Sequence, residues 1–191
     1  SVCPSCGGSG QTILSRGPGT DSNGMLNSDE TVSINIPAGV EEGMQLKVTG
    51  KGNDSNNPNG ISGDLLVLIE ESSDNNFTRE GKHLHYDLYI SISEAALGVS
   101  KDIHLIDGKV RIKLESGIQS GKTLRLKNKG IPDLNGYSKG DLLVHVNIWT
   151  PKTLNKKQKD FFKEMLDDDN FKPNPNKTDK SFFEKVRDMF A

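Results

Sequence analysis

Apolar and polar residues alternate in several short runs between residues 44 and 127, which is the spacing of half-buried β-strands. Asp107-Gly108 separates two of these runs and is the strongest short hairpin signal. Two further runs are predominantly apolar and follow a Gly-Asp pair, as strands bounded by turns do. The alternating runs are MQLKV (44–48), HLHYDLYISI (83–92), KDIHLI (101–106), KVRIKL (109–114) and TLRLK (123–127), and the apolar ones are LLVLI (65–69) and LLVHV (142–146). These patterns predict a mainly β protein.

The strand pattern occurs twice. Residues 36–52 match residues 114–130 at a constant offset of 78, as Gly39 and Gly117 or Gly52 and Gly130 illustrate. The pentapeptide GDLLV then recurs at 63–67 and 140–144, an offset of 77, so the second copy has lost one residue in the intervening loop. Such a repeat predicts an internal duplication, with two related β domains in tandem.

The first copy lacks a counterpart of the strands that open the second. Residues 81–113 correspond by the same offset to residues 3–35, but residues 1–29 are rich in Cys, Gly, Ser and Asn and have no strand pattern. We therefore expect the first strands of the first domain to lie upstream of Ser1. The predicted domains are a remnant of a Gly/Cys-rich insertion at 1–29, an incomplete first β domain at 30–75, and a second β domain at 76–151.

Residues 152–191 have the periodicity of helices, interrupted by a polar linker at 167–180. Asn155 with Gln158, and Ser181 with Glu184, are predicted capping boxes at the starts of two helices. Helices this short are marginal in water by themselves, so their apolar stripe must dock on their own chain or on a partner. The apolar residues of the stripe are Phe161, Phe162, Met165, Leu166, Phe182, Phe183, Val186 and Phe190, and docking on a second copy of the chain would make residues 152–191 a dimerisation tail.

The composition of the chain excludes some classes of binding partner. The chain is 26% charged and 32% hydrophobic, as soluble globular proteins are. Its net charge of −2 provides no basic surplus for nucleic acid, and no apolar run is long enough to cross a membrane. We therefore expect a cytoplasmic protein with neither nucleic acid nor membrane as its partner.

Cys3 and Cys6 are the only cysteines and have the C-x-x-C spacing of half a zinc site. Zinc takes four ligands, and the chain has no second cysteine pair, so we expect a half-site whose other half is missing. A redox pair is the alternative, disfavoured because no helix follows Cys3 to lower its pKa.

No constellation of residues indicates catalysis, and we predict no catalytic residue and no enzyme activity. His83, His85 and His145 fall in strand patterns, where histidines are more often satisfied surface or core residues than ligands. The segment from Ser120 to Thr123 resembles the end of a phosphate-binding loop. That motif needs four residues between its two glycines and a helix after it, but Gly117 is one residue too close to Gly121 and a strand pattern follows.

The segments C-x-x-C-x-G-x-G, IPAGVEEGMQLKVTGKG, GDLLVLIEE, DGKVRIKLESGIQSGKTLRLKNKGIP and GDLLVHVNIWTPKTLNKKQKDFF together resemble the C-terminal half of the DnaJ family of heat-shock co-chaperones. The resemblance covers essentially the whole chain. It implies two tandem β-sandwich domains, the first interrupted by a cysteine-rich region that binds two zinc ions, and a dimerising C-terminal segment. The family's J-domain, which stimulates a DnaK-type chaperone, has no counterpart in these residues. Gly17 and Thr20 stand where the family's fourth repeat has cysteines, so that repeat is degenerate and the parent protein is expected to hold at most one zinc.

The resemblance also implies the function, which is to bind unfolded polypeptide clients and deliver them to the DnaK-type chaperone. Clients of the family add along an open sheet edge of the first β domain, with apolar pockets taking alternate side chains. Carried over to this sequence, the groove walls are Val32, Ile34, Val67 and Ile69. The alternative function is a structural or adhesive β-sandwich module without chaperone activity.

Overall fold

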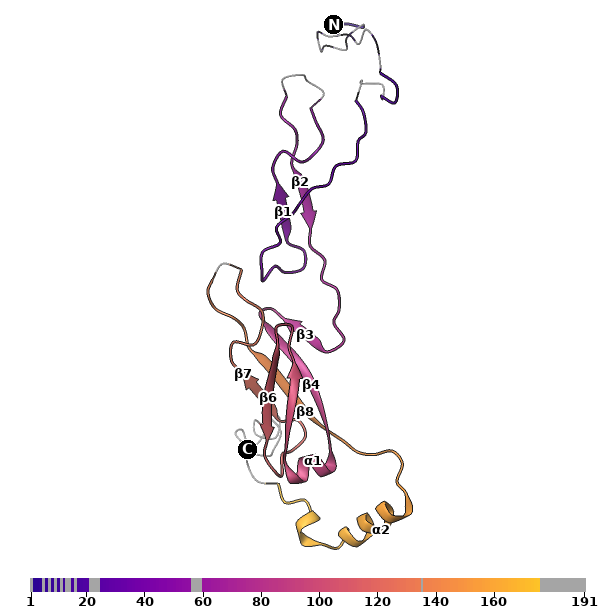
Figure 1. Cartoon of the computed structure of the whole chain (residues 1–191), viewed down its shortest axis with the longest axis vertical. Helices are drawn as coiled ribbons and strands as arrows, with labels where there is room; N and C mark the ends of the chain where they lie inside the picture. The colour runs from indigo at the N-terminus through magenta and orange to yellow at the C-terminus, as the bar shows by residue number, and fades with distance from the viewer. Residues whose placement is uncertain are drawn as a thin grey trace, which may run out of the picture. The chain divides into compact units, whose positions relative to one another are not determined.

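The computed structural model describes residues 2–175 apart from positions 5, 7, 9, 11, 13, 14, 16, 21–24, 56–59 and 135 (Figure 1). The chain divides into two compact units, Ser1–Ser72 and Ser73–Ala191. Strands predominate over helices in both, which confirms the predicted mainly β class.

Unit 1 contains one antiparallel pair of strands, β1 (Gln45–Val48) and β2 (Leu65–Leu68). In their register Leu46 lies opposite Val67 and Lys47 lies opposite Leu66. Successive side chains point to opposite faces of a sheet. The pair therefore has one face of half-buried apolar residues and one exposed face.

Unit 2 has a four-stranded sheet in the order β3-β4-β8-β7. Its central strands, β4 (His83–Ser91) and β8 (Leu142–Trp149), run parallel, and the outer strands β3 (Phe77–Glu80) and β7 (Thr123–Leu126) are antiparallel to them. Two further strands, β5 (Val99–His104) and β6 (Lys109–Leu114), form an antiparallel hairpin. At its turn the Leu105 N–H donates to the Gly108 carbonyl at 2.9 Å, which confirms the predicted hairpin.

The core of unit 2 lies between this hairpin and the sheet, and Figure 1 shows β6 passing over β4 and β8. Fully burying an aliphatic side chain stabilises a fold by about 1.5–3 kcal/mol. The contacts thus hold two layers together in the predicted sandwich-like arrangement. The buried apolar residues are Leu84, Leu88, Ile90, Ala95, Ile103, Ile112, Leu114, Ile118, Leu142, Val144 and Val146.

A short helix, α1 (Ile92–Leu97), follows β4 directly and was not predicted. Its N-cap is Ser91, whose hydroxyl accepts from the Glu94 N–H while the Glu94 carboxylate accepts from the Ser91 N–H. This S-x-x-E capping box is a sequence signal for a helix start. The strand alternation that continues into Ile92 obscured it.

Helix α2 (Lys156–Met165) begins as predicted. The Gln158 N–H donates to Asn155 Oδ1 at 3.0 Å, and the Asn155 N–H donates to Gln158 Oε1 at 2.9 Å. A 3₁₀ turn, η1 (Asp169–Phe171), lies within the segment predicted to be a polar linker. The helix predicted from Ser181 lies outside the described residues. Among the helices that are described, none has the length and apolar character of a membrane span.

The duplication is visible in the backbone hydrogen bonds of both units. In unit 1 the Gly52 N–H donates to the Gly63 carbonyl at 2.8 Å, and in unit 2 the Gly130 N–H donates to the Gly140 carbonyl at 2.9 Å. These four glycines are the pairs that the sequence offsets match. At these glycines the two units therefore share local geometry as well as sequence.

Candidate functional site

The candidate site is the inner face of the β1–β2 pair, by which we mean Leu46, Val48, Leu65, Val67 and Ile69. All five side chains are half-buried. Their counterparts in unit 2 face the hairpin, and those of Val67 and Ile69 are Val144 and Val146, each 0% exposed. In the described residues of unit 1, β1 and β2 are the only strands. An apolar surface that is core in one copy of the repeat is therefore only partly covered in the other.

The predicted groove residues fall in two segments. Val67 and Ile69 belong to the inner face, at alternate positions of β2 and just beyond its end. Val32 and Ile34 are half-buried between exposed neighbours, which is the burial pattern of a strand, although residues 27–37 form no strand pairing. The roles of these four residues in client binding remain predictions.

The opposite face of β2 carries two residues that the sequence reasoning missed. Leu66 is 61% exposed and Leu68 is 56% exposed, and they lie across from Lys47 and Gln45 of β1. Because LLVLI is apolar at every position, its periodicity does not say which residues point outward. The repeat supplies the missing signal, since the counterparts of Leu66 and Leu68 are Leu143 and His145, which alternate with the buried core residues of β8.

An aspartate lies directly before β2 in unit 1 and directly before β8 in unit 2, and in both places its carboxylate is held by a backbone N–H and a basic side chain. In unit 1 Asp64 accepts from the Gly50 N–H at 2.9 Å and pairs with Lys47 at 2.5 Å. In unit 2 Asp141 accepts from the Asn128 N–H at 2.9 Å and pairs with Arg125 at 2.5 Å. The hydrogen bond from Lys47, followed by that from the Gly50 N–H, lowers the pKa of Asp64. For Asp141 the Asn128 N–H is the largest cause of a lowered pKa, and Arg125 adds to it.

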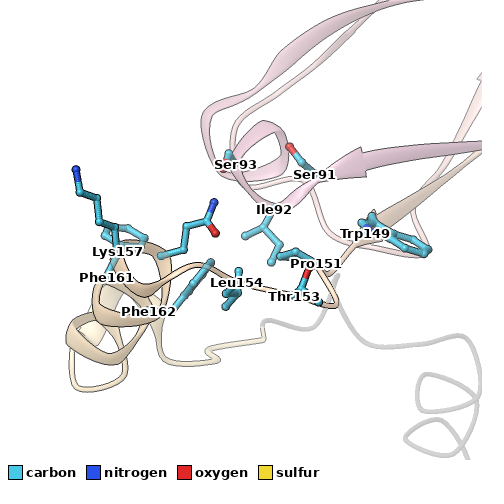
Figure 2. A pocket seen from close by; sticks show the side chains of 11 residues that line it. Ser91, Ile92, Ser93, Trp149, Pro151, Thr153, Leu154, Lys157, Phe161 and Phe162 are labelled. Carbon is cyan, nitrogen blue, oxygen red and sulfur yellow. The ribbon is translucent and has the colours of Figure 1, made fainter.

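A second apolar surface lies in unit 2, where α2 follows the sheet. A groove of about 400 Å³ separates α2 from the end of β8 and the start of α1. Figure 2 shows the side chains of Ile92, Leu154 and Phe162 converging on it from α1, the connecting loop and α2. The Trp149 and Phe161 rings, which also line the groove, are each 50% exposed.

The predicted dimerisation residues of α2 are only partly covered within the described chain. Leu166 is 74% exposed, while Phe162 and Met165 are half-buried. Phe161 packs edge-on against Phe162 and against Phe171 of η1. The remaining four predicted residues, Phe182, Phe183, Val186 and Phe190, lie outside the described residues.

The cysteines provide two of the four ligands that a zinc ion needs. Cys3 is exposed and Cys6 is half-buried. Within the described ranges, no three His, Cys, Asp or Glu side chains gather in a group that fits a metal ion. The described residues of this chain therefore do not fit a closed zinc site, and the half-site formed by Cys3 and Cys6 remains a prediction.

Comparison with known proteins identifies the family. The family model of the DnaJ C terminal domain matches residues 11–151. The chaperone protein DnaJ of Bacteroides thetaiotaomicron is 44% identical over 188 residues, which are 98% of this chain and 43% of that protein. The chaperone protein DnaJ of Bacteroides fragilis is 46% identical over 167 residues, which are 87% of this chain and 42% of that protein. The chaperone protein DnaJ of Salinibacter ruber is 38% identical over 192 residues, which are 100% of this chain and 46% of that protein. The chain thus spans about half the length of the curated relatives it matches. Because the family model covers most of its residues, including both copies of the repeat, the chain belongs to the DnaJ C-terminal domain family.

Proposed function

We propose that this chain is the polypeptide-binding part of a DnaJ-type co-chaperone, acting in the cytoplasm. In this proposal it holds unfolded or misfolded clients and, as part of a longer protein, delivers them to a DnaK-type, ATP-driven chaperone. It performs no chemistry itself. The observation that carries the proposal is the half-buried inner face of unit 1, which matches the buried core of unit 2.

An extended client would bind by strand addition, in which main-chain hydrogen bonds give affinity and pockets select alternate side chains. The counterpart of β1 in unit 2 is β7, which is an edge strand of the sheet. This supports β1 as an edge to which a client strand can add. Alternate side chains of that strand would then reach the inner face, with Val32, Ile34, Val67 and Ile69 as its walls.

We further propose that the chain acts as a homodimer through its C-terminal tail. Support comes from the exposed aromatic and aliphatic side chains of α2 and from the apolar groove beside them. Soluble monomers rarely leave a large contiguous apolar patch in water. Two chains joined there would engage one client at two sites, which raises avidity through effective concentration.

Peptide binding tests the proposal and its groove. A fluorescent, extended apolar peptide should gain anisotropy when the chain is added. Replacing Val67 by Thr, which nearly preserves its shape, together with Ile69 by Thr, which also removes one methyl group, should weaken binding. Replacing Leu66 and Leu68 by Thr is the matched control on the opposite face of the same strand and should leave binding unchanged.

Two outcomes would count against this function. If the control pair weakens binding and the inner pair does not, the client contacts the outer face of β2 and the assigned walls are wrong. If neither the chain nor a longer version extended upstream of Ser1 binds the peptide, the alternative of a structural or adhesive β-sandwich module is favoured.

A further inference from the structure

An open pocket lies in unit 2, between the turn of the β5–β6 hairpin and the loop that follows β7. Its volume is about 170 Å³, close to that of a cavity of about 150 Å³ that holds one benzene molecule in another protein. It therefore has room for one aromatic or branched aliphatic side chain. Its walls range from Leu84, which is 5% exposed, to Ile106, which is 77% exposed. The apolar residues that line it are Phe77, Leu84, Leu105, Ile106, Ile131 and Pro132.

Backbone hydrogen bonds fix both sides of the pocket. On the hairpin side, the Leu105 N–H donates to the Gly108 carbonyl at 2.9 Å. On the other side, the Ile131 N–H donates to the Lys82 carbonyl at 2.9 Å, which ties the loop to the start of β4. The walls are thus ordered before anything binds, so that little of their conformational entropy is lost when a ligand enters.

Positive charge surrounds the pocket, although the chain as a whole has a net charge of −2. Lys129 and Lys139 line it, and the backbone of Lys82 is bonded to Ile131 in its wall. All three lysines are exposed, and none of their ammonium groups has an ion-pair partner among the residues that the structure describes. Asp107 is the one carboxylate among the lining residues. The surface therefore attracts anionic groups.

These features are not part of the repeat. At the offsets that align the two copies, Pro132 corresponds to Asp54 and Lys139 corresponds to Ser62. In unit 1 the Ser62 hydroxyl donates to the Asp54 carboxylate at 2.6 Å. An apolar wall and a cation in unit 2 thus replace a bonded polar pair in unit 1, so the pocket adds a chemistry that the inner face of unit 1 does not have.

We propose that this pocket binds an acidic segment of another polypeptide. One apolar side chain fills the pocket, and carboxylates on either side of it meet Lys82, Lys129 and Lys139. A pocket of this volume takes a single side chain, so the rest of the ligand continues outside it, as an extended chain does. Because each exposed ion pair contributes little, binding is weak, with a Kd of roughly 0.1–1 mM. The proposal does not rest on the inner face of unit 1.

Titration of the full, ¹⁵N-labelled chain with a synthetic peptide tests the pocket. The peptide has one Phe with two Glu residues on each side. Amide resonances of residues 105–108 and 128–132 should shift more than those of the other described residues. A peptide with Ser in place of Phe should bind at least about tenfold more weakly, because the apolar burial is lost. A peptide with Lys in place of every Glu should also bind more weakly, because like charges repel.

Surface variants of the chain separate the two contributions. Lys129→Gln and Lys139→Gln should each weaken binding of the acidic peptide by about two- to fivefold, as loss of an exposed ion pair does. Ile106→Ser should weaken it severalfold. Lys113→Gln on β6 and Leu97→Ser at the end of α1 are matched controls at exposed positions away from the pocket, and they should not change binding. Thermal melts of all five variants should match that of the parent.

Three results would overturn the proposal. The pocket is not the site if residues 105–108 and 128–132 show no shifts at about 5 mM peptide, which lies well above the expected Kd. Equal binding of the Ser peptide would mean a simple anion-binding surface, and equal binding of the Lys peptide would mean that charge has no role. The variant with Val67 and Ile69 replaced by Thr should bind the acidic peptide as the parent does, whatever its effect on clients. Loss of the peptide in that variant would place the peptide on unit 1 instead.

Discussion

A methyl group added at Gly140 should destabilise unit 2 severely. A Cβ atom there would lie 1.7 Å from the Lys82 carbonyl oxygen and 2.4 Å from its carbon, where an ordinary contact is about 3.5 Å or more. Both neighbours are backbone, so they move only with the start of β4. That carbonyl accepts from the Ile131 N–H at 2.9 Å, and the adjacent Leu84 N–H donates to Asp141 at 3.0 Å.

The size of the effect follows from these contacts. Overpacking costs about 1–3 kcal/mol. Losing the two backbone hydrogen bonds adds about 1 kcal/mol each. Gly140→Ala should thus lower the free energy of unfolding by roughly 3–5 kcal/mol, which is a large part of the total for a small domain. For a unit of this size the Tm should fall by roughly 10–20 °C.

The repeat provides a matched control, because Gly63 opens the same GDLLV motif in unit 1. A Cβ atom at Gly63 would meet nothing closer than the Asn53 carbonyl oxygen at 3.7 Å, an ordinary contact. Gly63→Ala should therefore change stability by no more than about 0.5 kcal/mol.

Two readouts together cover both units. Trp149, the only tryptophan, lies on β8, so its fluorescence follows the unfolding of unit 2. Hydrogen exchange resolved by segment should show faster exchange in β4 and β8 for Gly140→Ala, and unchanged exchange in β1 and β2 for Gly63→Ala. If the unfolding transition followed by Trp149 fluorescence is unaltered in Gly140→Ala, the close approach of the Lys82 backbone to Gly140 is refuted.

Three further outcomes are expected. Asp141→Asn should lower the denaturation midpoint at neutral pH. Because the folded pKa of Asp141 lies below its ordinary value of 3.8, the stability it contributes is present above that value and is lost as the pH falls through the folded pKa, so the difference from wild type should shrink in strong acid. Zinc analysis of the purified chain should find well under one tightly held equivalent per monomer, because two thiolates leave two positions to water; stoichiometric, chelator-resistant zinc would contradict this unless two chains share one ion. Truncation after Thr150 should convert a dimer to a monomer in sedimentation, and an intact chain that is already monomeric at tens of micromolar would refute dimerisation.

The parts of the fold that sequence predicted well are those in which a local pattern has one physical solution. Asp107-Gly108 fits a tight hairpin, and Asn155 with Gln158 satisfies the first amides of a helix. Helix α1 was missed although Ser91 and Glu94 form the same kind of box, because apolar and polar residues also alternate up to Ile92.

The candidate site was less predictable than the fold. Val67 and Ile69 were predicted from the family resemblance alone. Their counterparts in unit 2, Val144 and Val146, are buried in the core. Leu66 and Leu68 were missed because a run of apolar residues has no polar position to mark its outer side. His85 Nδ1 lies 2.9 Å from His145 Nε2, a contact that depends on the parallel register of β4 and β8, which no local pattern encodes.

Light scattering by an aggregating, chemically denatured client tests the central claim most directly. Added at less than one chain per client, this chain should slow and reduce the rise in scattering because it covers exposed apolar segments. The variant with Val67 and Ile69 replaced by Thr should protect less, and that with Leu66 and Leu68 replaced should protect fully. If scattering rises as it does with the same amount of an inert globular protein, and a longer version extended upstream of Ser1 also fails to reduce it, the chain does not hold unfolded polypeptide.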